Sequence, residues 1–239
     1  MDAQTLIQES KPFLEWLVNW YNNLPTQELS AVITDPEHVA VLSVDVIKGF
    51  LYEGPLASPR VARIAQPIVR LFQRAYDLGV RHFILLQDTH DPEAVEFGSF
   101  PPHAVAGTPE SETIPELQAL PFADQFVRIA KNSISSNLNT RLPAWLDEHP
   151  EVTTFIVVGD VTDMCTYQLA LYLRLRANAW QRKGDRVLLP VNCVETYDLP
   201  VEAAEKIGAY PHPGDLLHLI FLHSMAIHGV ELFARFSDA

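Results

Sequence analysis

Cysteine is scarce in this chain of 239 residues, which contains only Cys165 and Cys193. Two cysteines are too few for a disulfide framework, so a small cystine-stabilised secreted scaffold is excluded. No apolar run approaches the roughly 18 residues that a membrane span requires. The first residues have neither the basic region nor the apolar segment of a secretory signal. We therefore expect a protein of a reducing compartment, the cytoplasm, with no membrane partner.

Positive charge is also in short supply. The chain has 17 Lys and Arg against 30 Asp and Glu, a net charge of −13. Such a surface repels phosphate backbones and anionic lipids, so a nucleic-acid partner is not expected. Apolar residues make up 48% and charged residues 20% of the chain, which is enough for a sizeable core and excludes a disordered chain. The composition leaves a small neutral substrate open.

Short apolar runs alternate with helical patterns along the chain. We expect an amphipathic helix over residues 3–22 and a connector over 24–38. Strands are predicted at 39–45, 82–88, 125–130, 153–159 and 186–191, and helices at 59–78, 140–149, 163–181, 200–208 and 214–235. This alternation predicts one α/β domain over residues 39–239, built on a mostly parallel, doubly wound sheet and preceded by residues 1–38. A homo-oligomer is also expected, because the aromatic-rich first helix and the final segment could pack on a neighbouring copy.

Polar residues follow several of the predicted strands. Asp45, Asp88 and Lys131 each stand at a strand end, and a turn follows Gly159. Ligands of open α/β sheets bind at the carboxyl ends of the strands. Acidic, basic and thiol groups are therefore expected to meet at one edge of the sheet.

Cys165 lies in the first turn of a helix that follows a strand and a tight turn, with Thr162 or Asp163 expected as the helix cap. The positive end of a helix stabilises a thiolate, and the N–H groups of such a turn can bind an oxyanion. These features favour a nucleophile, although a free cysteine is more often a small buried apolar residue. Cys193 has no helix start after it and is interpreted as structural.

Asp45 and Lys131 could supply a general base and an electrostatic activator for this thiol. Each alone would more often be a solvated charge at a strand end. Their joint presence with Cys165 favours a catalytic interpretation.

A third group of residues has the composition of a metal site. Asp88 and His90 lie on the same side of an extended chain, and His103 follows on a loop. Three protein ligands with open positions are typical of a catalytic metal, and this set suits Zn, with Fe or Mn also tolerated. Glu96 is a candidate fourth ligand or supporting residue. The alternative is an ordinary polar loop.

The remaining histidines carry less information. His212, His218, His223 and His228 fall in and before the last predicted helix. His218 and His228 have no matching acidic partner and are interpreted as residues of the core edge or of an interface. A glycine-rich phosphate loop and a serine-centred nucleophile turn are both absent from the sequence.

The segments VLSVDVIKGF, RIAKNSISSNL and VVGDVTDMCT resemble those of the isochorismatase-like cysteine hydrolases. The stretch from Asp88-x-His90 to Pro-Pro-His103 and Gly107-Thr108 is similar to the nicotinamidase branch of that superfamily. The resemblance covers about residues 39–200. It implies a three-layer α/β/α fold and hydrolysis of a carboxamide through a cysteine thioester.

The resemblance also implies a role for each matching residue. Cys165 would be the nucleophile, Asp45 the base, and Lys131 the group that polarises the site and favours the thiolate. The backbone N–H groups of Val161 and Cys165 would form the oxyanion hole, and the peptide between Asp160 and Val161 would be cis. The remaining implied roles are aromatic stacking on the substrate by Phe50 and Phe100, and coordination by Asp88, His90 and His103 of a metal that binds the pyridine nitrogen of nicotinamide and a water.

Two other classes of function stay open. Within the superfamily, the chain could be an isochorismatase-type vinyl-ether hydrolase or an N-carbamoyl amidase, and these branches do not need the metal site. A catalytically silent scaffold of the same fold is the third alternative. Intact Asp45, Lys131 and Cys165 argue against that alternative, because a silent relative has no chemical need for all three.

Overall fold

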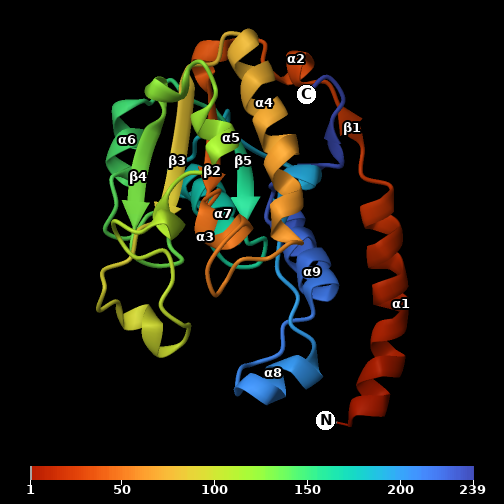
Figure 1. Ribbon diagram of the computed structural model, residues 1–239. Helices are drawn as coiled ribbons and strands as arrows, with labels where there is room; N and C mark the ends of the chain where they lie inside the picture. Colours follow the sequence, from red (N-terminus) through yellow and green to blue (C-terminus); the bar gives the residue numbers. More distant parts are fainter. Residues whose placement is uncertain (1) are drawn as a thin grey trace.

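A parallel β-sheet forms the centre of the molecule in the computed structural model, which describes residues 2–239 (Figure 1). Its seven strands run in the order β4-β3-β2-β5-β6-β8, with β7 beside β5, and every pair is parallel. The strands are β2 (Val39–Val44), β3 (His82–Asp88), β4 (Val127–Lys131), β5 (Thr154–Asp160), β6 (Arg186–Pro190), β7 (Val194–Glu195) and β8 (Glu231–Phe233). The predicted α/β class is confirmed.

Helices cover both faces of this sheet, which makes three layers. One face carries α3 (Lys48–Leu51), α4 (Ala65–Asp77) and α5 (Pro115–Gln118), and the other carries α6 (Leu142–Glu148), α7 (Cys165–Ala179) and α9 (Gly214–Ile227). The short 3-10 helices are η1 (Pro36–His38), η2 (Val61–Ile64), η3 (Val95–Gly98), η4 (Pro109–Ser111), η5 (Ala123–Gln125) and η6 (Val191–Cys193).

The central strands are apolar because neither face meets water. All six residues of β2 are buried, and alternate side chains enter the two helical layers. Strands covered on both faces read as continuous apolar runs rather than as alternating patterns. Each fully buried Leu or Ile contributes about 1.5–3 kcal/mol relative to an exposed one, so the runs that identify the strands also stabilise the sheet.

The strand order reverses between β2 and β5. From β2 the chain winds outward to β3 and β4, and from β5 it winds the other way to β6 and β8. The two central strands approach closely at their ends, since a Cβ on Gly159 would lie 2.0 Å from the Val44 carbonyl oxygen. Ligands of doubly wound sheets bind at such a reversal, beyond the carboxyl ends of the strands. The fold therefore points to the ends of β2 and β5, at the lower edge of the sheet in Figure 1.

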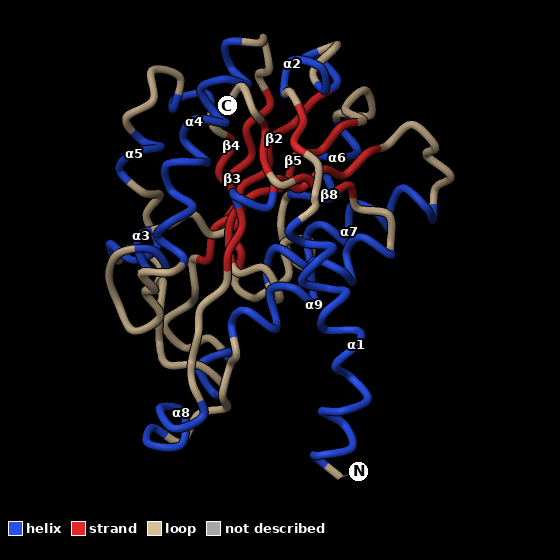
Figure 2. The backbone as a smooth tube through the Cα atoms, turned by 90° about the vertical axis from the view of Figure 1, so that its right-hand side faces the viewer, coloured by secondary structure: helices blue, strands red, loops and turns tan. Residues whose placement is uncertain are grey.

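The extra N-terminal helix is present as predicted. It is α1 (Ala3–Asn22), and the Asp2 side chain accepts a hydrogen bond from the Thr5 N–H at its start. Leu17 is its one fully buried residue, and its contacts are with α9. Its first turns project from the body, as does α8 (Val201–Ile207) (Figure 2).

Two stretches differ from the prediction. The expected connector 24–38 contains β1 (Thr26–Gln27), which pairs with β9 (Arg235–Phe236), and α2 (Leu29–Val32), which contributes Leu29 to the core. The helix expected over 214–235 ends at Ile227, because Gly229 adopts a left-handed φ of +95°. The apolar residues after it form β8 at the sheet edge instead of a further helical turn.

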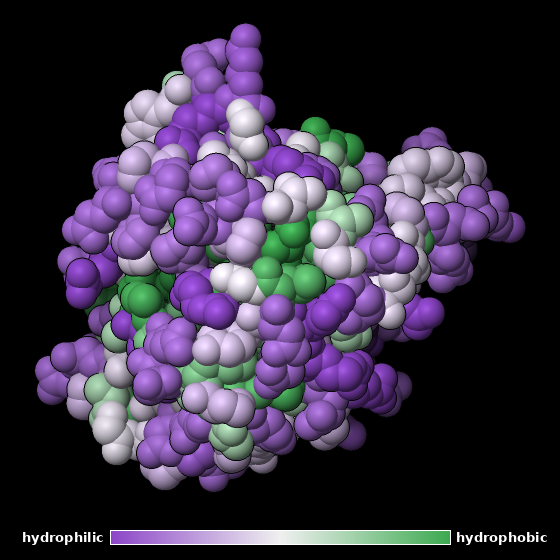
Figure 3. Space-filling view, turned by 90° about the horizontal axis from the view of Figure 1, so that it is seen from above, coloured by the Kyte–Doolittle hydropathy of each residue, from purple (hydrophilic) through white to green (hydrophobic). Residues whose placement is uncertain are grey.

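One face of the molecule is largely polar. The face seen in Figure 3 is mostly hydrophilic, with small scattered apolar patches. Among residues 2–239, no helix is both long enough and apolar enough to cross a membrane.

Candidate active site

Asp45 follows β2 at the point where the strand order reverses. Its φ of +55° lies in the left-handed region, which Asp tolerates better than most residues. The Asp45 N–H donates to the Leu86 carbonyl at 2.8 Å, and its Oδ1 accepts from the Asp88 N–H at 2.7 Å. The side chain is 1% exposed. The β3 backbone therefore fixes this carboxylate from two directions.

Lys131 is the last residue of β4, and its side chain extends to Asp45. Its Nζ lies 2.8 Å from Asp45 Oδ2 and donates to Asp88 Oδ1 at 2.6 Å. It also contacts the Ser133 carbonyl at 3.2 Å and Cys165 Sγ at 3.6 Å. An ammonium group this deeply buried is stabilised only by such a ring of acceptors.

Cys165 is the first residue of α7 and is buried. Its sulfur and carboxylate oxygens of Asp45 and Asp88 lie within 4.8 Å of one another. The predicted helix cap, Thr162 or Asp163, is wrong. Met164 occupies the cap position and makes no side-chain cap hydrogen bond. The Asp163 and Thr162 side chains bond to the C-terminal part of the chain instead.

The turn before Cys165 has free backbone donors. The Asp160–Val161 peptide is cis, as the resemblance implied. Within residues 2–239, the N–H groups of Val161 and Cys165 donate no hydrogen bond, whereas those of Thr162, Met164 and Thr166 do. Two unpaired N–H groups beside a thiol match the requirement for binding an oxyanion.

The buried charges shift one another's protonation. Burial and the nearby Asp88 raise the pKa of Asp45 to about 7, against the effect of Lys131. Burial opposes the charged forms of both Lys131 and Asp88. Asp45 and then Asp88 nevertheless raise the pKa of Lys131 well above its usual value, and Lys131 lowers the pKa of Asp88 below its usual value.

Opposing effects act on the pKa of the Cys165 thiol. Burial and the two carboxylates raise the pKa of Cys165 well above its usual value, and Lys131 offsets this only in part. Lys131 therefore acts on the thiol in the expected direction, while burial keeps the proton on sulfur in this arrangement. Such a thiol needs an adjacent base to react, and Asp45 is the carboxylate beside it.

A second cluster shares Asp88 with the first. One ligand atom from each of Asp88, His90 and His103 lies within 4.8 Å of the others, and all three residues are buried. The imidazole of His90 bonds through Nδ1 to Asn132 Oδ1 at 3.0 Å, and that of His103 bonds through Nδ1 to the Pro101 carbonyl at 2.8 Å.

These hydrogen bonds decide which ring nitrogen of each histidine can bind a metal ion. The Asn132 and Pro101 oxygens are acceptors, so each Nδ1 carries hydrogen and each Nε2 of a neutral ring presents a lone pair. The buried His90 Nε2 has no hydrogen-bond partner within the described chain. Two imidazole nitrogens and a carboxylate, fixed by supporting hydrogen bonds, fit a divalent metal ion. Glu96 lies outside this cluster, on η3.

The two predicted stacking residues lie beside the second cluster. The Phe50 ring is 5.6 Å and the Phe100 ring 6.2 Å from the His103 ring, measured between centroids. Phe50 comes from α3 and Phe100 from the loop after η3, so two separate segments bring aromatic rings to one place.

Two polar residues at the site were missed from the sequence, Asp160 and Asn132. Asp160 ends β5, is 1% exposed, and neither carboxyl oxygen has a hydrogen-bond partner among the described residues. It follows an apolar run as Asp45 does, and that pattern could have identified it. Asn132 was missed because its role depends on a contact with His90.

The prediction that His218 lacks an acidic partner is wrong, because His218 Nδ1 lies 3.6 Å from Glu195 Oε1. His212 also has an acidic partner, since its Nε2 lies 2.8 Å from Asp163 Oδ2. These partners are far away in sequence, so no local spacing reveals them. Cys193 is buried, as its structural interpretation requires.

Comparison with known proteins places this geometry in a family. A family model described as "Isochorismatase domain" matches residues 39–202. Nicotinamidase 1 of Arabidopsis thaliana is 27% identical over an alignment of 234 residues that covers 88% of this chain and 91% of the relative.

Two solved structures share the fold. The nicotinamidase of Bacillus subtilis is 24% identical with a TM-score of 0.61, and the match covers 82% of this chain and 99% of that one. The pyrazinamidase of Pyrococcus horikoshii in complex with zinc is 20% identical with a TM-score of 0.59, covering 82% and 98%. The family model matches more than half of the chain, including the strand-end residues Asp45, Asp88 and Lys131 and the helix start at Cys165, so the chain belongs to the isochorismatase family.

Proposed function

We propose that this family member is a metal-containing cysteine amidohydrolase that converts nicotinamide to nicotinate and ammonia through a thioester on Cys165. The observation that carries the proposal is the buried contact of Lys131 Nζ with Asp45 and Cys165 at the reversal point of the sheet. The similarity to the Arabidopsis nicotinamidase supports the choice of substrate.

In the proposed reaction, Asp45 takes the proton from Cys165 Sγ as the thiolate attacks the carboxamide carbon. The C–N bond then breaks, and Asp45 returns the proton to the departing ammonia. A water molecule attacks the resulting thioester, which releases the carboxylic acid and restores the thiol. A positioned general base is worth about 10²–10⁴-fold in rate. Lys131 holds both carboxylates in place and partly compensates the negative charge.

The N–H groups of Val161 and Cys165 would bind the carbonyl oxygen as it gains charge. Donors of this kind are worth about 10²–10³-fold each. Phe50 and Phe100 would hold the aromatic ring of the substrate.

Asp88, His90 and His103 would hold the metal, and we propose Zn, with Fe or Mn accepted by the same donors. A bound divalent ion supplies a Lewis acid that anchors a ring nitrogen and a water. The zinc in the Pyrococcus pyrazinamidase supports the choice of ion. Glu96, which lies outside this cluster, would not be a ligand of the metal.

The alternatives within the family are an isochorismatase-type hydrolase and an N-carbamoyl amidase. They differ from the proposal in not needing the second cluster, so stoichiometric metal in the purified protein favours the nicotinamidase. The buried contacts of Lys131 argue against a silent scaffold, because such a group is costly to bury without a function.

Ammonia release from nicotinamide by zinc- or iron-loaded protein tests the proposal, with Cys165→Ala as the control. We expect release by the wild type and none by the variant. Absence of release from folded, metal-loaded wild type would overturn the nicotinamide assignment, and carbamoyl compounds and isochorismate would be tested next.

We also propose that residues 39–239 form the hydrolase domain and that the protein works in the cytoplasm.

We further propose that the chain self-associates. Exposed apolar side chains on α1 support this, because an apolar surface is typical of an interface; they are Leu6, Ile7, Phe13, Leu14, Trp16 and Val18. Light scattering of the wild type and of Ile7→Lys tests this: a dimer or larger species that the substitution dissociates is expected, and a monomeric wild type would contradict it.

A further inference from the structure

Asp163 stands two residues before Cys165, and its carboxylate is committed to the C-terminal part of the chain. Oδ1 accepts a hydrogen bond from Thr196 Oγ1 at 2.6 Å, and Oδ2 lies 2.8 Å from His212 Nε2. The side chains of Asp163 and His212 are only 5% and 6% exposed. A buried pair of this kind is costly to form, so it calls for a reason at this place.

Both ring nitrogens of His212 face oxygen atoms of the chain. Nε2 lies 2.8 Å from the Asp163 carboxylate, and Nδ1 lies 3.0 Å from the Tyr197 carbonyl oxygen. The imidazole therefore bridges Asp163 and the backbone at Tyr197. Although burial works in the opposite direction, the bonds from His212 and Thr196 hold the pKa of Asp163 below its usual value. The Tyr197 ring stacks on His212 at 3.8 Å, which fixes the plane of the imidazole.

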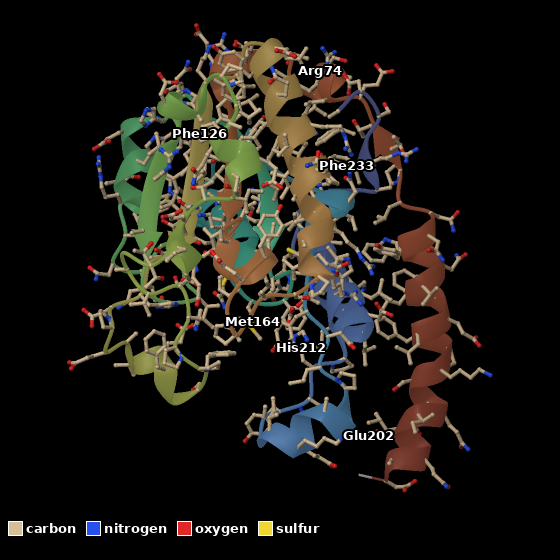
Figure 4. The ribbon with its side chains drawn as sticks, viewed as in Figure 1. Arg74, Phe126, Met164, Glu202, His212 and Phe233 are labelled. Carbon is tan, nitrogen blue, oxygen red and sulfur yellow. The ribbon has the colours of Figure 1, made fainter. Side chains whose placement is uncertain are left out.

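Thr162, the residue before Asp163, is also bonded to the C-terminal part of the chain. The Thr162 N–H donates to the Glu195 carbonyl at 3.0 Å, and Thr162 Oγ1 bonds to His218 Nδ1 at 2.9 Å. His212 is itself anchored by two backbone hydrogen bonds of 2.8 Å with Leu199, which close the loop that carries α8. In Figure 4, His212 and Met164 lie together below the sheet and above α8.

We propose that His212 is a positioning residue for turnover: through Asp163 it fixes the turn that presents the Val161 and Cys165 N–H groups and the Cys165 sulfur. The helix start has no side-chain cap of its own, so the orientation of this turn depends on contacts from outside. His212 touches no reacting atom. The inference rests on the proposed function only in taking Cys165 as the nucleophile, and it does not depend on which amide is the substrate.

Steady-state kinetics on nicotinamide with His212→Ala, His212→Gln and Asp163→Asn test this inference. Misplacement of a reacting group by about 1 Å can cost about 100-fold in rate, so we expect kcat of His212→Ala to fall about 10- to 100-fold with a smaller change in KM. The Gln amide can still donate to Asp163, so His212→Gln should retain more activity than His212→Ala. Added imidazole should restore part of the activity of His212→Ala.

His149 offers a matched control. Its Nδ1 also bonds to a backbone carbonyl, that of Trp145 at 2.8 Å, and its ring stacks on Trp145 at 4.2 Å. It lies before β5, at the other end of that strand from Cys165. His149→Ala should therefore leave kcat within about twofold of the wild type, on the usual scale of surface substitutions.

A generic acyl donor, p-nitrophenyl acetate, separates this inference from the choice of substrate. Wild type should give a burst of nitrophenolate that Cys165→Ser lacks, and the burst rate should fall in the three variants in parallel with kcat. A wild-type burst without ammonia release would overturn the nicotinamide assignment, while slower bursts in the variants would still support the role of His212. Unchanged burst rate and kcat in folded His212→Ala and Asp163→Asn, with only the melting temperature lowered, would overturn the positioning role of His212.

Discussion

The two clusters that share Asp88 differ in how fully their polar atoms are satisfied. Around Lys131, the ammonium meets Asp45, Asp88 and the Ser133 carbonyl, all within 3.2 Å. In the other cluster, His90 Nε2 makes no hydrogen bond within residues 2–239 and lies 3.5 Å from Asp88 Oδ1. The charge of Lys131 is therefore balanced by groups of the chain itself, whereas His90 keeps one ring nitrogen free to bind a further group.

Cys165→Ala should have the largest effect, because it removes the nucleophile and leaves both sets of charges in place. Loss of a catalytic nucleophile costs at least about 10⁴-fold in turnover. We expect this loss of ammonia release with unchanged metal content, measured by elemental analysis of the same sample. A variant that kept turnover, or that lost its metal together with its activity, would break the distinction between the clusters.

Lys131→Met should destabilise the fold more than any change in the second cluster. Removal of the ammonium leaves Asp45 and Asp88 buried without their counter-charge, and breaking a buried pair costs about 3–5 kcal/mol. Urea unfolding measures this free energy. Lys48→Met is the matched control, since the Lys48–Glu112 pair is more exposed and should contribute far less to stability. Equal effects of the two substitutions would argue that the Lys131 contacts are not stabilising.

Removal of the metal, or His103→Ala, should affect substrate binding more than the chemical step. We expect KM for nicotinamide to rise about 10- to 100-fold, the usual scale for perturbing a metal site, with a smaller change in kcat. The burst with p-nitrophenyl acetate should persist, because that probe has no ring nitrogen to anchor. Loss of the burst on chelation would show that the two clusters do not act separately.

Asp160→Asn gives the smallest expected effect and sharpens the comparison at a third carboxyl. Burial and Asp45 raise the pKa of Asp160 well above its usual value of 3.8. The folded state therefore keeps a proton that the unfolded chain releases, and the stability from this group is lost as pH rises above about 3.8. Asp160→Asn should consequently raise the free energy of unfolding relative to wild type at pH 7, and by less at pH 4. Urea unfolding at the two pH values measures this, and a gain independent of pH would contradict it.

The sheet and its strand-end residues could be predicted because both depend on local pattern. A parallel strand covered on both faces is a continuous apolar run, and a polar residue that ends it stands at the ligand-binding edge. Asp45, Asp88 and Lys131 were found in this way, and their contacts follow from strand order alone. Helix α1 was equally accessible, since its apolar spacing is periodic.

The remaining features depend on pairings between distant parts of the chain. Asp163 precedes β6 and β7 in the sequence and His212 follows them. No local sequence pattern therefore indicates the bond between these two residues. β8 was read as helix because its three residues are too short to show a strand period, and pairing with β6 decides their conformation. The cap prediction failed for the same reason, because tertiary partners took the Asp163 side chain.

The central claim is that Cys165 carries the acyl group during hydrolysis of nicotinamide. Acid quenching during turnover, followed by mass analysis of the peptide that contains Cys165, tests it most directly. We predict a nicotinoyl adduct on that peptide that disappears when nicotinamide is exhausted, and no adduct on the Cys193 peptide. Ammonia release with an unmodified Cys165 peptide, or release that persists in Cys165→Ala, would contradict the account.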